Sequence, residues 1–356
     1  MHLIVKVAET NGQYNEHCLP MVNKRSITIC GYFKSEATPP REITLFDGDN
    51  SLGGFFRALK AALLERDYDV IHAHSPYTGI FLLMSLVRHR RYRTLIASTV
   101  YTVQDSYLDY PLSNRLMLFP IFACFRKLIF CSHAAATSMP FYLKWLARNK
   151  SDVVLNAVDI DRVDHTTRNK RDRDPHFTIT SVGRLTEIKN LACLLMAFEQ
   201  SNDRDSQLLI IGEGHLRPRL TAKTQELGLQ RQVTLAGLVP RDQVFEYLTR
   251  AEVFVSVSRG EGLPVAVLEA MACRRPVILS DIPPHREIAD GVNFINLIQP
   301  DDVAGFAGEI RRFREMSRAE RAEIGDKCRK LVEDRFSLAT MHKACDTIYN
   351  QIRDHR

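Results

Sequence analysis

The sequence has no apolar run long enough to cross a membrane. Its longest uninterrupted apolar stretch, Leu116 to Phe125, has ten residues and contains Pro120, whereas a spanning helix needs roughly 20 apolar residues. The run from Leu3 to Val7 is too short for the core of a secretory signal. We therefore expect a cytoplasmic protein whose contact with a membrane is at most peripheral.

The sequence also lacks the cysteine patterns of zinc sites and disulfide frameworks. None of its eight cysteines belongs to a Cys-x-x-Cys pair or has a histidine at zinc spacing, so reduced and mostly buried thiols are expected. The excess of positive charge is small, +6 over 356 residues. It suggests an anionic substrate or surface and gives no reason to expect a nucleic-acid partner.

Short apolar runs alternate with helical patterns along most of the chain. This alternation is typical of parallel sheets in layered α/β domains, and the length suggests about two domains. The segment 162–176 contains a charge run and reads as a linker, while the segment 301–356 reads as helices only. The expected strands are 3–7, 26–29, 70–74, 95–100, 127–131, 153–155, 177–182, 207–211, 233–235, 253–257, 277–279 and 293–297.

Two glutamates, Glu261 and Glu269, stand eight positions apart across a predicted junction between a loop and a helix. The apolar run 253–257 ends in a loop with two glycines, one of them Gly262, and Pro264 suits the first position of a helix. Free amides at this helix start favour a negative group such as a diphosphate; they belong to Leu263, Val265 and Ala266. Taken alone, the two glutamates also fit a surface loop acid and an exposed helix residue.

Three further motifs lie in the same half of the chain. Gly183 follows a predicted strand and precedes Arg184 and Lys189, two cations suited to neutralising a diphosphate; as an isolated pair they also fit ordinary surface charges. Gly212 begins a Gly-x-Gly turn, which is equally typical of a tight turn between a strand and a helix. The segment 233–240 contains Leu238 and Val239, whose main chain is a candidate for contact with a nucleobase.

These motifs, in this order, resemble the nucleotide-sugar-binding signature of retaining glycosyltransferases of the GT-B fold, specifically family 4. The resemblance covers most of the segment 153–334. It implies two doubly wound Rossmann-like domains with a cleft between them: an acceptor domain over 1–160 and a nucleotide-sugar domain over 161–336. It also implies a final helix, 337–356, that crosses back to the amino-terminal domain.

The reaction that the resemblance implies is transfer of a sugar from a UDP or GDP sugar to a hydroxyl group, with retention at the anomeric carbon. Arg184 and Lys189 would stabilise the diphosphate, Glu261 would orient the donor sugar, and Glu269 would hold the ribose. The chain has no Asp-x-Asp metal motif at a predicted strand end, and Asp47-Gly-Asp49 reads as a turn. We therefore expect no metal and no other cofactor.

The amino-terminal half departs from the family pattern. Where relatives carry a Gly-Gly turn after the first strand, this chain has the loop 10–17 with a single glycine, Gly12, and with His17. His74 at a predicted strand end is a candidate for contact with the acceptor, or alternatively a buried strand histidine. Tyr101 takes the place of a family histidine; its phenol can donate a hydrogen bond but is a poor base near neutral pH.

The acceptor is the least defined part of the prediction. Cations at 88–93 and the apolar stretch 116–125 suggest peripheral contact with an anionic membrane, or else a solvated basic turn and a buried core helix. The resemblance implies a role in the synthesis of cell-surface polysaccharide, lipopolysaccharide or glycolipid, possibilities that include a lipid-linked saccharide as acceptor. The alternatives are a GT-B epimerase or phosphorylase, and a non-catalytic module that binds nucleotide sugars.

Overall fold

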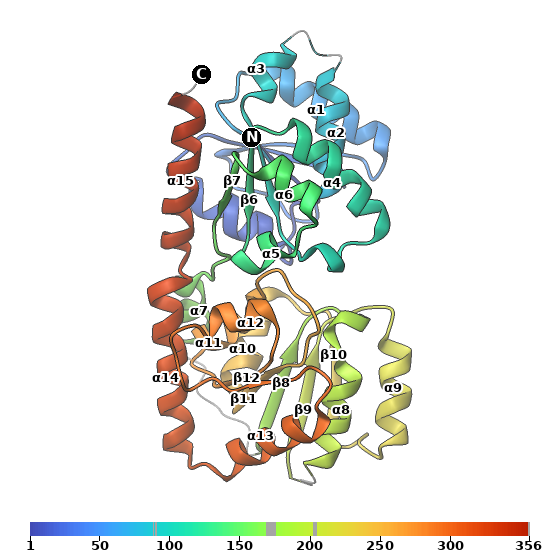
Figure 1. Cartoon of the computed structure of the whole chain (residues 1–356), viewed down its shortest axis with the longest axis vertical. Coiled ribbons are helices and arrows are strands. Elements are labelled where there is room, and N and C mark those ends of the chain that lie inside the picture. Colours follow the sequence, from blue (N-terminus) through green and yellow to red (C-terminus); the bar gives the residue numbers. More distant parts are fainter. Residues whose placement is uncertain (88, 90, 169–175, 202–204, 355–356) are drawn as a thin grey trace. The chain divides into compact units, whose positions relative to one another are not determined.

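The computed structural model describes residues 1–87, 89, 91–168, 176–201 and 205–354, and the chain forms two compact units. The first unit comprises Met1–Leu155 and Ala339–Arg356, and the second comprises Asn156–Leu338. Each unit contains one parallel sheet with helices packed around it (Figure 1). The predicted α/β class with two Rossmann-like domains is therefore confirmed.

The first unit is built on a seven-stranded sheet in the order β3-β2-β1-β4-β5-β6-β7. Every pairing in it is parallel, with His2 opposite His72 in the register of β1 and β4. The strands are β1 His2–Ile4, β2 Ile27–Gly31, β3 Ile43–Asp47, β4 Ile71–Ala73, β5 Thr99–Val103, β6 Lys127–Phe130 and β7 Ser151–Val153.

Helices connect these strands, as a parallel sheet requires. Ser51 begins the first long helix, because its side chain accepts a hydrogen bond from the amide of Gly54. The carboxyl-terminal helix packs against the same sheet through a hydrogen bond between the Tyr349 hydroxyl and His72 Nδ1. The helical segments are η1 Gln13–Cys18, η2 Leu19–Met21, α1 Leu52–Glu65, α2 Pro76–Val87, α3 Tyr92–Ile96, η3 Tyr107–Asp109, α4 Leu112–Cys124, α5 His133–Ser138, α6 Phe141–Ala147 and α15 Leu338–Asp354.

The second unit is built on a six-stranded parallel sheet in the order β10-β9-β8-β11-β12-β13. Its central strands are apolar and buried on both faces, which is typical of parallel sheets covered by helices. The strands are β8 Thr178–Val182, β9 Gln207–Ile211, β10 Val233–Gly237, β11 Val253–Ser256, β12 Val277–Ser280 and β13 Leu297–Ile298. The helical segments are α7 Ile160–Thr167, η4 Glu187–Lys189, α8 Leu191–Gln200, α9 Arg217–Glu226, α10 Arg241–Arg250, α11 Val265–Ala272, α12 Pro283–Ile288, α13 Val303–Glu315 and α14 Arg318–Arg335.

Several predicted elements differ from the structure. Residues 92–96 form α3, so the strand expected at 95–100 begins only at Thr99, and the strand expected at 293–297 is reduced to β13. The expected linker begins as α7, and its charge run at 169–175 lies outside the described residues. The expected loop 10–17 is helical from Gln13 onward. The apolar character of 95–96 and 293–297 misled the prediction, because short apolar runs do not distinguish strands from buried turns and helices.

Two general expectations about the chain agree with the structure. All eight cysteines are free thiols, and all except Cys124 are buried. Within the described part of the chain, no helix combines the length and the apolar character needed to cross a membrane.

Candidate active site

The candidate site of the second unit lies at the carboxyl ends of β8 and β11. The chain leaves β8 through Gly183 and Arg184 and then forms η4, which carries Lys189; it leaves β11 into the loop that carries Glu261. The amide of Arg259 donates a hydrogen bond of 2.8 Å to the carbonyl of Ile188. This bond joins the loop after β8 to the loop after β11, so residues far apart in the sequence lie close together at this edge of the sheet.

Lys189 and Glu261 form an ion pair at this place. The Lys189 Nζ atom lies 2.5 Å from Glu261 Oε1, and both side chains are mostly buried. The Ser258 hydroxyl donates a second hydrogen bond, of 2.7 Å, to the same oxygen. Burial raises the pKa of Glu261, but the charge and hydrogen bond of Lys189 and the bond from Ser258 outweigh it and hold that pKa below its ordinary value. Glu261 is therefore ionised at neutral pH.

Both partners keep bonding capacity for a ligand. An ammonium group has three donors, and within the described residues Lys189 Nζ makes one hydrogen bond, the bond to Glu261. Glu261 Oε1 accepts the bonds from Lys189 and Ser258, and Oε2 accepts none from the described residues. The pair can thus donate toward an anion and accept from a hydroxyl group at the same time.

Two glycines make room for this arrangement. A Cβ atom on Gly183 would lie 3.1 Å from Cε of Lys189, so a larger residue would crowd the lysine stem. Gly212 has a φ of +137°, which other residues rarely adopt, and a Cβ atom there would lie only 2.0 Å from the carbonyl oxygen of Gly183. The Gly212 amide also donates to the Gly237 carbonyl, at 2.9 Å. In this structure Gly212 has a packing role between β8 and β9.

Arg184 differs from Lys189 in its surroundings. Its side chain is exposed and forms no ion pair or hydrogen bond with the described residues. A small pocket lies next to it at the ends of β8 and β11, lined by Ser181, Val182, Gly183, Lys189, Leu191, Ser256, Val257 and Ser258. Arg184 is therefore a cation available to a ligand near this pocket.

Helix α11 begins next to Glu261 and carries Glu269. Pro264 is the N-cap, so the helix starts at Val265, one residue later than predicted. The amides of Val265 and Ala266 precede the first intrahelical bonds, which run from Val267 and Leu268 to the Pro264 carbonyl. Gly262, Leu263 and Pro264 are buried, and the Leu263 carbonyl accepts a 2.9 Å bond from the Asn156 amide.

Glu269 is paired with an arginine that the sequence did not single out. Its Oε1 atom lies 2.7 Å from an amino group of Arg241, the first residue of α10, and both side chains are about nine-tenths buried. The two residues come from different helices, so no local pattern connects them. The bland interpretation of Glu269 as an exposed helix residue is therefore wrong.

The candidate nucleobase segment follows β10. Leu238 is exposed and Val239 is half-buried, and both stand in a turn before α10 rather than inside a strand. Their main chain is therefore free of the sheet ladder of the second unit. A contact with a nucleobase through main-chain atoms needs such a segment, and it stays a prediction.

His285 is a second buried residue of this region that the sequence did not single out. It is fully buried on α12, and its Nδ1 atom lies 2.8 Å from the carbonyl oxygen of Ser280. Burial lowers the pKa of His285 to about 4, despite the opposing effect of the Glu261 charge. The imidazole is therefore neutral at neutral pH. It contacts Ser280, whose hydroxyl donates a 2.5 Å hydrogen bond to the Ser258 carbonyl.

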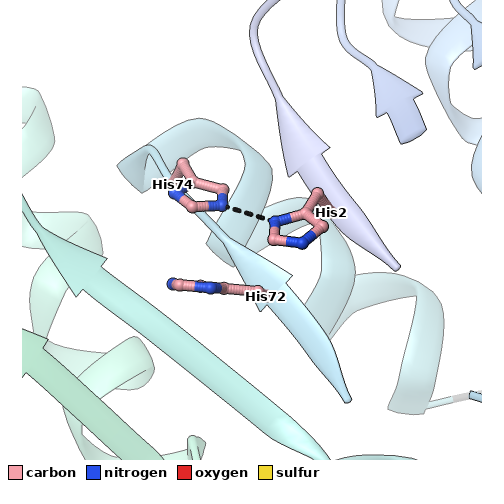
Figure 2. A group of neighbouring side chains, drawn as sticks. All are labelled: His2, His72 and His74. Carbon is pink, nitrogen blue, oxygen red and sulfur yellow. Dashed lines mark hydrogen bonds between the residues drawn. The ribbon is translucent and has the colours of Figure 1, made fainter. Parts of the chain in front are cut away.

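The first unit holds the candidates assigned to the acceptor side, and His74 lies there in a group of histidines. Figure 2 shows the rings of His2 on β1, His72 on β4 and His74, the residue after β4, close together. His2 Nδ1 lies 3.0 Å from His74 Nε2, and the rings of His72 and His74 are stacked 4.0 Å apart. Burial and the neighbouring imidazoles hold the pKa of each ring well below its ordinary value.

This histidine group is a hydrogen-bonded stack in the structure. Its ligating atoms lie within 4.8 Å of one another, close enough to suggest a metal. However, His72 uses both ring nitrogens, at 2.7 Å from the Tyr349 hydroxyl and 2.6 Å from the Thr102 hydroxyl. His74 is buried, which agrees with the alternative of a buried strand histidine, and its contact with the acceptor stays a prediction.

The other acceptor-side candidates lie at η1 and in β5. Gly12 is the N-cap of η1 with an ordinary helical φ of −59°, and His17 in η1 lies 4.8 Å from the His74 ring. Tyr101 is fully buried in β5, and burial raises the pKa of its phenol. Its hydroxyl has no hydrogen-bond partner among the described residues. The structure therefore gives no support to a hydrogen bond from Tyr101 to an acceptor sugar.

Comparisons with known protein families match both units. The model described as Glycosyltransferase Family 4 matches residues 34–162, and the model described as Glycosyl transferases group 1 matches residues 176–315. The chain belongs to glycosyltransferase family 4. As a member of this family it is an enzyme, a glycosyltransferase, as the motifs of the second unit predict.

Two curated relatives and one solved structure illustrate the similarity. The glycosyltransferase is 28% identical over 76% of its length, and 72% of the relative, to an Escherichia coli enzyme named UDP-Gal:alpha-D-GlcNAc-diphosphoundecaprenol alpha-1,3-galactosyltransferase. It is 31% identical over 38% of its length to a Campylobacter jejuni enzyme named N-acetylgalactosamine-N,N'-diacetylbacillosaminyl-diphospho-undecaprenol 4-alpha-N-acetylgalactosaminyltransferase, and this match spans only 36% of that relative. The structure of Anabaena HepE in complex with UDP and glucose aligns with a TM-score of 0.73 at 16% identity, covering 98% of this chain and 100% of HepE.

Proposed function

We propose that this glycosyltransferase transfers a sugar from a nucleoside diphosphate sugar to a hydroxyl group, with retention of configuration at the anomeric carbon. The observation that carries the proposal is the Lys189–Glu261 ion pair near Arg184, which is unpaired among the described residues, at the carboxyl ends of β8 and β11. Cations suit the diphosphate and a free carboxylate oxygen suits a sugar hydroxyl. The structure of HepE, a complex with UDP and glucose, supports this class of donor.

In the proposed reaction, the bond between the anomeric carbon and the diphosphate oxygen breaks while the acceptor oxygen bonds to that carbon. The acceptor's proton passes to the departing diphosphate, so no protein nucleophile and no metal is required. Negative charge grows on the diphosphate as the bond breaks. Fixed cations at that point stabilise the transition state more than the ground state.

The residues divide this work as follows. Arg184 and Lys189 stabilise the diphosphate, together with the free amides at the start of α11. Glu261 accepts a hydrogen bond from a donor-sugar hydroxyl through Oε2, because Oε1 already holds Lys189 and Ser258. Glu269, oriented by Arg241, accepts from the ribose hydroxyls.

For the acceptor we propose a lipid-linked saccharide, in the synthesis of a cell-surface polysaccharide or glycolipid. The names of both curated relatives include diphosphoundecaprenol-linked sugars, which supports this class. Such an acceptor lies at a membrane, so we place the protein at the cytoplasmic face.

A donor screen tests this proposal. Purified protein is mixed with UDP- and GDP-linked hexoses and N-acetylhexosamines, first to measure thermal shift and then to measure released nucleoside diphosphate, with and without a chelator. We expect one donor to give release that does not depend on a metal. No shift and no release with any donor would contradict the proposal.

A further inference from the structure

The first unit exposes a group of large apolar side chains on two neighbouring helices. They are between 53% and 84% exposed. Their spacing, at positions i, i+4 and i+7 on α4 and at i and i+4 on α6, puts each set on one side of its helix. We name this group the α4–α6 face; it consists of Leu112, Leu116, Phe119, Phe141 and Trp145.

The sequence presents 116–125 as one apolar stretch, and the structure divides it. Leu118, Ile121 and Phe122 point into the core and are fully buried, whereas Leu116 and Phe119 point away from it. The interpretation of this stretch as a buried core helix is therefore right for one side of α4 only. Large exposed apolar groups of this kind mark interaction surfaces.

Aromatic contacts join the two helices into one surface. The rings of Phe119 on α4 and Tyr142 on α6 lie 6.5 Å apart, and the Tyr142 hydroxyl lies 2.9 Å from that of Tyr107. The guanidinium of Arg115 stacks over Tyr107 at 5.2 Å. The face is thus held by packed side chains, and Figure 1 shows α4 and α6 side by side in this unit.

The chain segment that carries the face contains charged residues of one sign only. Between Asp109 and Asp152 the sequence contains no aspartate or glutamate, but it contains Arg115, Arg126, Lys127, Lys144, Arg148 and Lys150. Lys127 pairs with Asp152, while Arg148 stacks over Trp145 at 5.2 Å. Cations on long apolar stems beside exposed aromatic and aliphatic side chains are typical of surfaces that enter the headgroup region of a membrane.

We propose that the α4–α6 face docks this protein on an anionic phospholipid bilayer. Its apolar side chains enter the headgroup boundary while Lys144 and Arg148 contact lipid phosphates. The basic segment 88–93 contributes less than expected, because Arg91 pairs with Asp67 and residues 88 and 90 lie outside the described residues. This proposal rests on the proposed lipid-linked acceptor. Its test uses neither donor nor acceptor, so membrane docking and sugar transfer can fail separately.

Trp145 offers a direct probe, because it is the one tryptophan of the chain. Its fluorescence is recorded while the full chain is titrated with phosphatidylcholine vesicles, either pure or mixed with phosphatidylglycerol. We expect emission to move to shorter wavelength with the anionic vesicles, with quenching when their acyl chains are brominated. Added salt should weaken the response, since it screens the cations.

Variants identify the face as the cause. Phe141→Ser keeps the probe and should weaken vesicle partitioning about tenfold, as expected for loss of one buried aromatic group. Lys144→Gln should weaken it about fivefold. Leu64→Ser on α1 is the matched control, because Leu64 is similarly exposed on another helix of the unit, and it should leave partitioning unchanged.

Three outcomes would overturn the proposal. The first is an emission spectrum that does not change with either vesicle. The second is an emission shift that follows protein concentration in the absence of lipid, which would assign the face to a second copy of the chain. The third is equal loss of partitioning in Leu64→Ser and Phe141→Ser, which would remove the assignment to this face.

Discussion

Lys189 and Glu261 meet at 2.5 Å although 72 positions separate them in the sequence. The contact arises because β8 and β11 are neighbours in a parallel sheet, so their carboxyl ends lie at the same edge. The sequence presents the two residues as independent candidates, and the contact joins them in one ion pair. Arg184, exposed and unpaired among the described residues, adds a cation to it.

The first prediction concerns these cations. Arg184→Ala and Lys189→Ala should each lower kcat about 10²- to 10³-fold, since a fixed electrostatic donor of this kind is worth about 2.7 to 4 kcal/mol in the transition state. Steady-state kinetics with the donor found in the screen measures this. Arg231→Ala, at an exposed arginine between α9 and β10, is the control and should keep wild-type rates. Wild-type rates in both site variants would refute the assignment.

The second prediction separates the role of Glu261 from that of its partner. Glu261→Gln keeps the shape but removes the charge that occupies Lys189. Binding of the nucleoside diphosphate alone should therefore stay equal or tighten, while kcat falls at least about tenfold because the sugar loses a charged acceptor. Calorimetry and kinetics on the same samples give both quantities. A parallel loss of nucleotide binding and turnover would instead point to a merely structural role.

The third prediction concerns Gly212. Gly212→Ala should destabilise the second unit by about 2 to 5 kcal/mol, because it combines an unfavourable φ with a clash against the Gly183 carbonyl. Gly228 also has a positive φ, +70°, but nothing lies within 4 Å of its Cβ position. Gly228→Ala should therefore cost only about 1 kcal/mol. Urea unfolding of the two variants compares them, and equal losses would contradict the packing argument.

The fourth prediction concerns acid stability. The pKa of His285 is about 4 in the folded chain and 6.5 when unperturbed, so the unfolded state binds the proton first as the pH falls. His285 is fully buried, and the free energy of unfolding should drop between pH 6.5 and 4, by about 2 kcal/mol at pH 5 for this residue. His285→Asn should be less stable at pH 7 but lose less stability on acidification. An unchanged pH dependence in the variant would contradict this origin.

Much of the second unit follows from its sequence. Three of its strands, β8, β9 and β11, are short runs with β-branched residues that end in glycine-containing loops. Strand β9 begins and ends at the predicted residues, Gln207–Ile211. The loop position of Glu261 and the helical position of Glu269 also follow from local pattern. These features depend on neighbours in the sequence, and periodicity records them well.

The pairings at the site do not follow from local pattern. Arg241 and Glu269 come from different helices. His285 lies on α12, a helix of six residues, which is too short to show an amphipathic period in the sequence. The ion pair of Lys189 depends on strand order, which the sequence does not state. Tyr101 stands near a strand end in the sequence, yet it is fully buried and its ring contacts Phe125, the residue after α4. Tertiary packing decides these contacts, and no local sequence pattern encodes them.

Retention during sugar transfer is tested most directly by the anomeric configuration of the product. The active donor is incubated with a polyprenyl-diphosphate-linked saccharide, and NMR of the purified product gives the configuration of the new linkage. We predict transfer with the configuration of the donor and release of nucleoside diphosphate, both lost in Arg184→Ala. A product of inverted configuration, or turnover unaffected by that substitution, would contradict the proposed reaction.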